Sequence, residues 1–189
     1  GAFAVPALSQ EILEDYYPGA KDVTLLSDSG QLLYAKWQYT ARELWGAGER
    51  FWKVLHTRNI TLDWYEALTS RFGDRLRYLY ASSTHDYLLS AYYNDVTNKI
   101  YESDAEVQDA YFQQLKDMAA SLKEMAPGIA FYFNSWKSPV TCGGTIHTVV
   151  REPYFFTTEP GRPSMAHWLR DAVAGKTGDI GAELLLRAH

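Results

Sequence analysis

Apolar residues recur at the spacing of an amphipathic helix in several parts of the chain, and residues 103–125 carry the clearest example. Its apolar face consists of Val107, Tyr111, Leu115, Met118, Leu122 and Met125. Ser103 and Glu106 form a capping box at the start, and Pro127-Gly128 follows the end. The sequence therefore predicts a long helix over 103–125.

Weaker helical patterns predict further helices elsewhere. The expected ranges are 7–16, 40–55, 62–80 and 164–173. The first is followed by Pro18-Gly19 and the last by Gly175, while Thr40 and Glu43 form a second capping box. The apolar stripe of 62–80 consists of Trp64, Leu68, Phe72, Leu76 and Leu79. Residues 179–187 are expected to add a final turn or two.

Runs of strand-forming residues predict several short strands. In 22–38 two such runs flank Asp28-Ser29-Gly30, which predicts a hairpin with Gly30 in the left-handed conformation. Residues 86–102 predict two more strands around a polar turn at 94–98. Further strands are expected at 129–133, 145–150 and 154–158, with Pro153 separating the last two.

The predicted strands come in adjacent runs and do not alternate with helices. This order indicates an α+β fold, with a mostly antiparallel curved sheet packed against the long amphipathic helix and additional helices. We find no internal repeat and no long linker, so residues 1–189 are expected to form a single globular α+β domain. Such a fold often leaves a concavity between its sheet and its helices.

Composition and charge narrow the classes of function. The net charge of −5 argues against a nucleic-acid partner bound through its phosphates. No apolar run approaches the length of a membrane span, and the single cysteine excludes an internal disulfide. The five histidines lack metal-binding spacing and no phosphate-binding glycine loop is present, so neither a metal nor a cofactor is expected. The cellular compartment is not indicated.

The segment 139–150 contains the cysteine and one candidate for catalysis. If Gly143-Gly144 forms a two-residue loop, Cys142 and His147 become diagonal neighbours on one face of a hairpin, about 7–8 Å apart at Cα. They could then act as thiolate nucleophile and base, with the glycine N–H groups as oxyanion donors. The local sequence supplies no electropositive setting for a thiolate, so an inert cysteine in a structural hairpin is the preferred interpretation.

A second polar stretch, 81–86, brings together Ser82, Ser83, His85 and Asp86. A Ser-His-Asp triad normally assembles from distant segments of a chain, whereas small hydroxyl residues before an aspartate often mark the junction of two elements. We interpret this stretch as such a junction.

Aromatic residues make up 15% of the chain, and part of them is expected on the surface. We expect Trp37, Trp45, Tyr92 and Tyr93 to contact a ligand or partner. The acidic face of 103–125 offers a second recognition surface, formed by Asp104, Asp109, Asp117 and Glu124. The leading hypothesis is a non-catalytic binding module for a protein partner or an apolar or aromatic ligand. The alternative is a cysteine-dependent hydrolase or acyltransferase that uses Cys142 and His147.

Overall fold

The centre of the protein is a parallel β-sheet. The computed structural model describes residues 2–97, 99, 101–137, 140–141, 143–151 and 153–186. Within these ranges the sheet has three strands in the order β1-β2-β3, namely β1 (Val23–Asp28), β2 (Leu76–Ser83) and β3 (Ala130–Asn134). Both strand pairs are parallel, with Val23 opposite Leu76 and Leu79 opposite Ala130.

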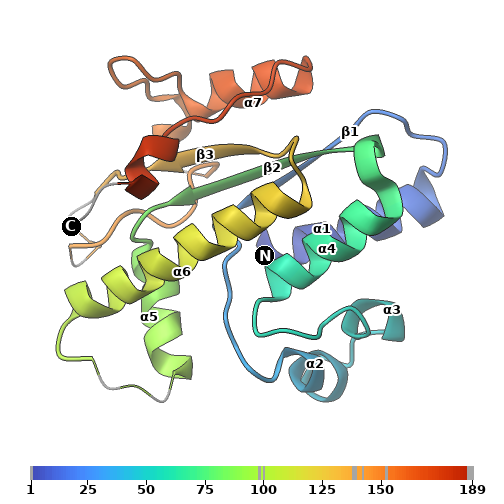
Figure 1. Ribbon diagram of the computed structural model, residues 1–189, viewed down its shortest axis with the longest axis horizontal. Coiled ribbons are helices and arrows are strands. Elements are labelled where there is room, and N and C mark those ends of the chain that lie inside the picture. The colour runs from blue at the N-terminus through green and yellow to red at the C-terminus, as the bar shows by residue number, and fades with distance from the viewer. Residues whose placement is uncertain are drawn as a thin grey trace.

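Helices connect and cover these strands. They are α1 (Val5–Glu11), α2 (Trp37–Tyr39), α3 (Glu49–Trp52), α4 (Ile60–Phe72), α5 (Tyr87–Val96), α6 (Asp104–Met125) and α7 (Met165–Val173). Single 3-10 turns cover Ala2–Ala4, Gly73–Arg75, Pro153–Phe156 and Ala182–Leu186, and π-helical turns cover Ile12–Tyr16 and Thr40–Leu44. Figure 1 shows α1, α4 and α6 on one face of the sheet and α7 on the other.

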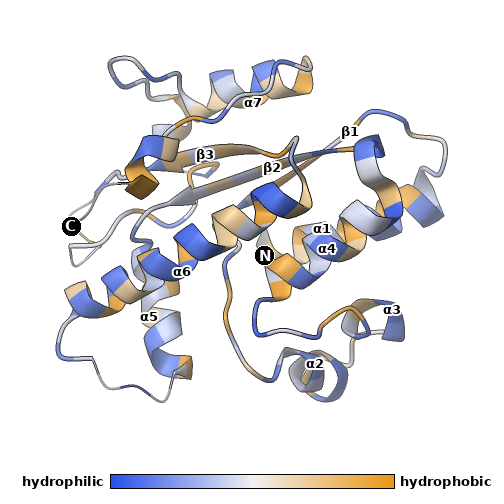
Figure 2. Ribbon diagram, viewed as in Figure 1, coloured by the Kyte–Doolittle hydropathy of each residue, from blue (hydrophilic) through white to orange (hydrophobic). Residues whose placement is uncertain are grey.

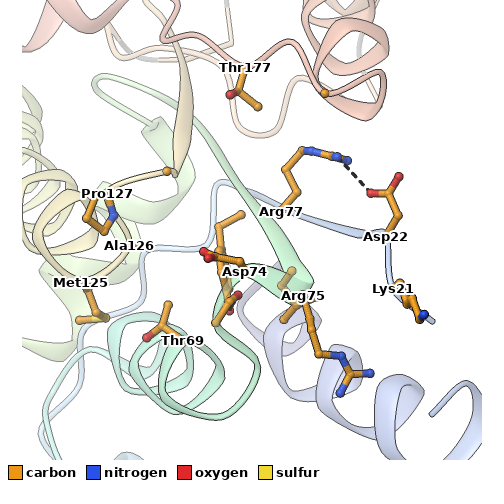
Figure 3. A pocket seen from close by; sticks show the side chains of 15 residues that line it. Lys21, Asp22, Thr69, Asp74, Arg75, Arg77, Met125, Ala126, Pro127 and Thr177 are labelled. Carbon is orange, nitrogen blue, oxygen red and sulfur yellow. Dashed lines mark hydrogen bonds and ion pairs between the residues drawn. The ribbon is translucent and has the colours of Figure 1, made fainter. Parts of the chain in front are cut away.

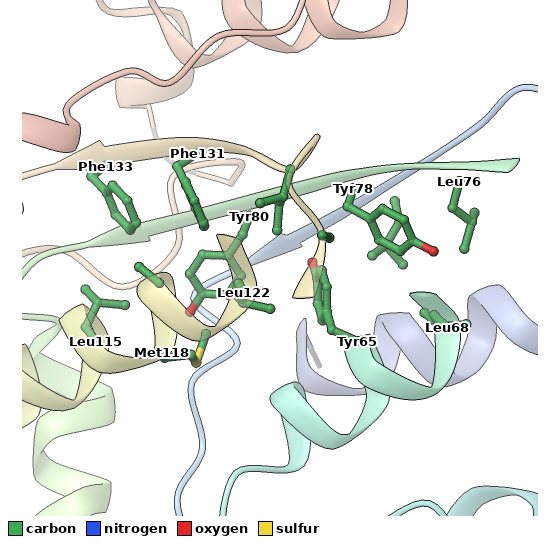
Figure 4. Close-up of a cluster of buried hydrophobic side chains, with 14 of the residues drawn as sticks. Tyr65, Leu68, Leu76, Tyr78, Tyr80, Leu115, Met118, Leu122, Phe131 and Phe133 are labelled. Atoms are coloured by element: carbon green, nitrogen blue, oxygen red, sulfur yellow. The ribbon is translucent and has the colours of Figure 1, made fainter. Parts of the chain in front are cut away.

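The hydrophobic core therefore has two layers, one on each face of the sheet. Tyr80 and Phe131 point toward α6 and pack with Leu115 and neighbouring side chains (Figure 4). On the opposite face, Tyr132 packs with Trp168 of α7. Strands buried on both faces read as continuous apolar runs, and Figure 2 shows this along β3, whereas the helices alternate between polar and apolar faces.

The predicted α+β class with a mostly antiparallel sheet is wrong, because the fold is α/β. Helices α2 to α4 lie between β1 and β2 in the chain, and α5 and α6 lie between β2 and β3. A parallel pair needs such a crossover, since the chain must return to the same end of the sheet before the next strand begins.

Several predicted elements are confirmed. The long helix is α6, and the Ser103 side chain accepts a hydrogen bond from the Glu106 N–H at its start. The helix predicted over 164–173 is α7, whose N-cap is Ser164. The strand predicted over 129–133 is β3. The helix predicted over 7–16 appears as α1 followed by a π-helical turn.

The hairpin predicted over 22–38 is wrong. Its first run forms β1, which pairs with β2 and not with the residues that follow it. No strand covers 31–38 in this described part of the chain. The left-handed conformation belongs to Ser29, with φ of 58°, and not to Gly30. The turn therefore leads away from the sheet and does not fold back on it.

The helix predicted over 62–80 is wrong in its second half. Helix α4 ends at Phe72 because Gly73 takes φ of 48°, and β2 begins three residues later. Leu76 and Leu79 continued the helical spacing by coincidence. In the structure they lie in β2, and their side chains belong to core layers on opposite faces of the sheet.

Three further predictions are wrong in detail. Residues 87–96 form helix α5, so the two strands predicted over 86–102 are absent from the described residues of this range; Asn98 and Ile100 lie outside them. The helix predicted over 40–55 is interrupted between its π-helical turn and α3. The strands predicted at 145–150 and 154–158 are not formed, because 145–150 pairs only through an isolated bridge and Pro153 starts a 3-10 turn.

Candidate functional site

Polar side chains gather where the three parallel strands end. In α/β proteins the carboxyl ends of the strands meet at one edge of the sheet, and ligands bind there. Asp28 is the last residue of β1 and Ser29 follows it. Asp86 comes shortly after β2, and His147 lies in the loop that follows β3. Each strand thus contributes one part of a common polar site.

Asp86 and His147 form the central contact of this site. Nδ1 of His147 lies 2.8 Å from Oδ2 of Asp86, whose side chain is fully buried. The other oxygen of Asp86 accepts the N–H groups of Leu88 and Leu89 at the start of α5. The carboxylate is therefore fixed from two sides, as an N-cap and as the partner of the imidazole.

The contact with Asp86 determines what the His147 ring can do. A carboxylate accepts a hydrogen bond, so Nδ1 carries the proton and Nε2 presents its lone pair. This tautomer is assigned from the hydrogen bond. The structure gives Nε2 no hydrogen-bond partner among the described residues, and the side chain is 20% exposed. His147 is thus arranged as an available base.

Backbone pairing with the segment around Asp86 places His147. Thr145 forms a parallel bridge with Asp86, in which its N–H donates to the His85 carbonyl and its carbonyl accepts from the Tyr87 N–H. Gly144 permits this approach, because a Cβ at this position would lie 2.7 Å from the His85 oxygen. The loop therefore runs beside residues 85–87, and His147 reaches the carboxylate.

Asp28 ties the same loop to β1. Its Oδ2 accepts the N–H groups of Val149 at 2.7 Å and Val150 at 2.9 Å. Burial raises the pKa of Asp28, while the two N–H groups, the Ser29 hydroxyl and a charged His147 act in the opposite direction. A single buried carboxyl group therefore joins the end of β1 to the two residues that follow Thr148.

Ser29 occupies a constrained position between these groups. Its Oγ accepts the Thr148 N–H at 3.1 Å and donates to Oδ1 of Asp28 at 3.3 Å. Ser29 and Thr148 are the non-glycine residues with positive φ in the described chain, at 58° and 59°. Left-handed non-glycine residues cost conformational energy and concentrate at functional sites. Both of them flank the site that contains His147.

A hydroxyl, an imidazole and a buried carboxylate are the components of a Ser-His-Asp triad. The imidazole can remove a proton from a nucleophile or from water, and Asp86 stabilises the imidazolium that forms. Ser29 is 4% exposed, and its Oγ lies beside the peptide that follows His147. In the structure the Ser29 hydroxyl is bonded to Asp28 and to the Thr148 N–H and not to the imidazole.

Sequence reasoning considered His147 and Asp86 separately and did not pair them. Cys142, the proposed nucleophile, lies outside the described residues, so its relation to His147 stays a prediction. In the stretch 81–86 only Asp86 reaches the imidazole. Ser83 instead donates to the Ile146 carbonyl, and the His85 ring stacks on Phe112 with 4.7 Å between ring centroids. Ser82 donates to the backbone of its neighbour.

Ser29 was missed because the sequence placed it in a hairpin turn. A usable signal was present nonetheless. A short polar stretch follows a run of strand formers at 28–29, at 82–86 and again after 133. If the strands had been taken as parallel, these polar ends would have been expected to converge at one edge of the sheet.

The structure brings together three of the four aromatic residues proposed for binding. Trp37, Trp45 and Tyr92 line a surface cavity of about 580 Å³. Tyr93 does not line this cavity; it is buried and packs against Tyr101. Trp37 is also buried, with 4% of its surface exposed, so of the three lining residues only Trp45 is largely exposed. The acidic residues of α6 named above, Asp104, Asp109, Asp117 and Glu124, are all exposed, and Asp109 lies 3.6 Å from Nε2 of His85. Their role in recognition stays a prediction.

A second cavity, of about 550 Å³, lies at the opposite edge of the sheet, where the strands begin (Figure 3). Its guanidinium groups are bound within the chain. Arg75 donates to the carbonyls of Pro18 and Ala20, and Arg77 pairs with Asp22 at 3.0 Å. These contacts hold the two arginine side chains against the segments that precede β1.

Over the ranges that the structure describes, no group of three or more His, Cys, Asp or Glu side chains is placed to hold a metal ion. None of the described helices combines the length and the apolar character needed to cross a membrane. Comparisons with protein-family models, curated proteins and solved structures give no significant match.

Proposed function

We propose that this protein is a serine hydrolase that cleaves carboxylic esters, with Ser29 as nucleophile, His147 as base and Asp86 as the residue that orients His147. The contact of 2.8 Å between His147 and Asp86, at the strand edge beside Ser29, carries the proposal. The chain order Ser, Asp, His after successive parallel strands is the order found in α/β-hydrolases. That likeness is one of arrangement and supports the proposal by analogy.

The proposed reaction begins with a rotation of the Ser29 hydroxyl from Asp28 toward Nε2 of His147. The hydroxyl proton passes to Nε2 while Oγ bonds to the carbonyl carbon of the ester. The tetrahedral intermediate collapses, the bond to the leaving oxygen breaks, and His147 returns the proton to that oxygen. A water molecule, deprotonated by His147, then cleaves the acyl-Ser29 ester and releases the carboxylic acid.

The surroundings of Ser29 depart in part from a standard nucleophile turn. In the G-x-S-x-G pattern, glycines stand two residues before and two residues after the serine. Here these positions are Ser27 and Gln31, and only Gly30 follows the serine directly. In that turn the N–H of the residue after the nucleophile stabilises the oxyanion. Gly30 holds that position here, but its N–H lies at the buried hydroxyl of Tyr80, so we assign no oxyanion donor to it.

Covalent labelling tests the proposal without knowledge of the natural substrate. A small alkyl fluorophosphonate phosphonylates activated serines, and intact mass and peptide mapping locate the adduct. We expect a single adduct on Ser29 that Ser29→Ala abolishes and His147→Ala slows at least 100-fold. Ser9→Ala is the matched control, since Ser9 is buried and hydrogen-bonded within α1, away from Asp86 and His147. Equal labelling of Ser29→Ala would overturn the proposal.

The cysteine-dependent alternative is a separate proposal and is tested by a different measurement. It predicts rapid alkylation of Cys142 by iodoacetamide near neutral pH, slowed in His147→Ala. Hydrolysis of 4-nitrophenyl acetate separates the two proposals. Loss of hydrolysis in Ser29→Ala with retention in Cys142→Ala supports the serine mechanism, and the opposite pair of results supports the cysteine mechanism.

The second candidate function is ligand binding through the aromatic cavity defined by Trp37, Trp45 and Tyr92. It is favoured by one observation, the convergence of these three residues from separate segments on a single cavity. Trp45 is 46% exposed, which is unusual for so large an apolar side chain. Binding and hydrolysis are compatible, since the cavity does not include Ser29 or His147 among its lining residues.

A further inference from the structure

The aromatic cavity combines π-faces with one negative charge. Its walls include Phe3, Tyr34, Trp37, Trp45 and Tyr92. Trp37 packs against Trp45 with 5.6 Å between ring centroids and against Tyr34 at 5.5 Å in an edge-on geometry. These ring contacts hold the walls of the cavity in place. The face of an aromatic ring is negative, so such walls attract a cation as well as an apolar group.

Asp95 supplies the negative charge. Among the described residues that line the cavity, Asp95 alone carries a charged side chain. This residue is exposed. It lies in the last turn of α5, which contains no basic residue. The carboxyl end of a helix carries partial negative charge, so an aspartate there is repelled by the helix itself. A cation bound beside Asp95 would be attracted by the Asp95 carboxylate and by the carboxyl end of α5.

We propose that this cavity binds a small organic cation with an alkylated ammonium head group. Aromatic faces bind the methyl groups through apolar contact and the positive charge through cation–π attraction. Asp95 and the end of α5 supply the charge complementarity that distinguishes a cation from a neutral group of equal shape. This inference rests on the second candidate function, binding in the aromatic cavity, and is independent of the Ser29 reaction.

Two probes of the same shape test the charge requirement. Choline carries a trimethylammonium group, and 3,3-dimethylbutan-1-ol replaces it with a neutral tert-butyl group. Titration is followed by proton NMR, because ring currents of the aromatic walls shift the methyl signal of a bound probe. We expect choline to bind at least tenfold more tightly than the alcohol. Trp45→Ala is expected to raise the Kd of choline at least fivefold, and Asp95→Asn at least threefold.

Matched variants separate the cavity from the rest of the surface. Tyr39→Ala removes an exposed aromatic residue outside the cavity lining, and Asp117→Asn neutralises an exposed acid on α6. Both are expected to leave the Kd of choline unchanged, as is Ser29→Ala. Equal affinity for the two probes would overturn the cation inference and leave apolar binding in the cavity standing. Absence of binding by both probes would overturn the cation inference and the second candidate function together.

Discussion

Oδ2 of Asp28 accepts the backbone N–H of Val149 at 2.7 Å, although 121 positions separate the two residues in sequence. Asp28 ends the strand that leads into Ser29, and Val149 follows His147 by two residues. Together with the bonds from Val150 to Asp28 and from Thr148 to Ser29, this hydrogen bond joins the two segments that carry the proposed nucleophile and base.

Removal of that acceptor should destabilise the protein. In Asp28→Ala the N–H groups of Val149 and Val150 lose their partner. A buried donor without an acceptor costs about 1–3 kcal/mol. We expect a loss of this size in the free energy of unfolding, measured by urea denaturation, and a fall in the hydrolysis rate. Unchanged stability would show that the two N–H groups are not held by Asp28 in solution.

The pH dependence of stability should show that folding raises the pKa of Asp28. Burial raises the pKa of Asp28, so the folded protein retains a proton at pH values where the unfolded chain has released it. Stability of the wild type relative to Asp28→Asn should therefore increase as pH falls through the range just above the usual aspartate pKa. Urea denaturation of both proteins between about pH 4 and about pH 7 measures this difference. A difference that decreases with falling pH would contradict the assignment.

Neutralisation of Asp86 should impair hydrolysis far more than folding. Asp86→Asn keeps an oxygen for the Leu88 and Leu89 N–H groups but loses the charge that selects the His147 tautomer. The comparable change in a serine protease lowers kcat about 10⁴-fold, and we expect a loss of about 10³- to 10⁴-fold here. Asp63→Asn is the control, since Asp63 is equally buried but binds the backbone of His56 and Thr57. Equal losses in the two variants would argue for a structural role of Asp86.

The close approach at Gly144 makes a further prediction. A Cβ there meets the backbone oxygen of His85 at 2.7 Å, which no side-chain rotation can relieve. Gly144→Ala should displace the loop that carries His147, lower stability by about 1–3 kcal/mol and reduce hydrolysis. Gly128→Ala is the control, because a Cβ at Gly128 has no neighbour within 4 Å. Kinetics and thermal unfolding of the two variants should differ accordingly.

The core layer beneath α6 can be tested independently of function. Leu115 is fully buried against the sheet, and Leu115→Ala should lower the free energy of unfolding by about 2–5 kcal/mol. Leu8→Ala, at an exposed position of α1, should change it by about 0.5 kcal/mol or less. Similar effects at the two positions would contradict the layer arrangement.

The sequence predicted the helices whose first turns are marked by capping residues, but it did not predict that the strands pair in parallel. Ser103 and Ser164 mark the starts of α6 and α7 through their own side chains, which is local information. Whether β1 pairs with the next residues or with β2 depends on packing contacts far along the chain. Turn residues such as Asp28-Ser29-Gly30 suit a hairpin equally well. The local pattern therefore predicted that β1 pairs with the residues directly after it, whereas β1 pairs with β2.

The candidate site was hidden from the sequence for the same reason. His147 was singled out beside Cys142, because neighbours in sequence are the pairs that spacing can detect. Its structural partner, Asp86, comes from the end of another strand, and their contact exists only when the parallel sheet is formed. Trp37, Trp45 and Tyr92 were all proposed from the sequence as contact residues, and all three line the aromatic cavity. The strand predicted around Tyr92 is helix α5, so the sequence did not predict how Tyr92 reaches the cavity.

The parallel sheet also dictates when this site can appear during folding. Val23 must find Leu76 and Leu79 must find Ala130, so about fifty residues lie between the partners of each strand pair and no local hairpin can initiate the sheet. Helix α6 can form early from its own sequence, whereas the ends of β1, β2 and β3 meet only late. A refolding chain should therefore regain most of its helical signal before His147 reaches Asp86, and hydrolysis should be among the last properties to return.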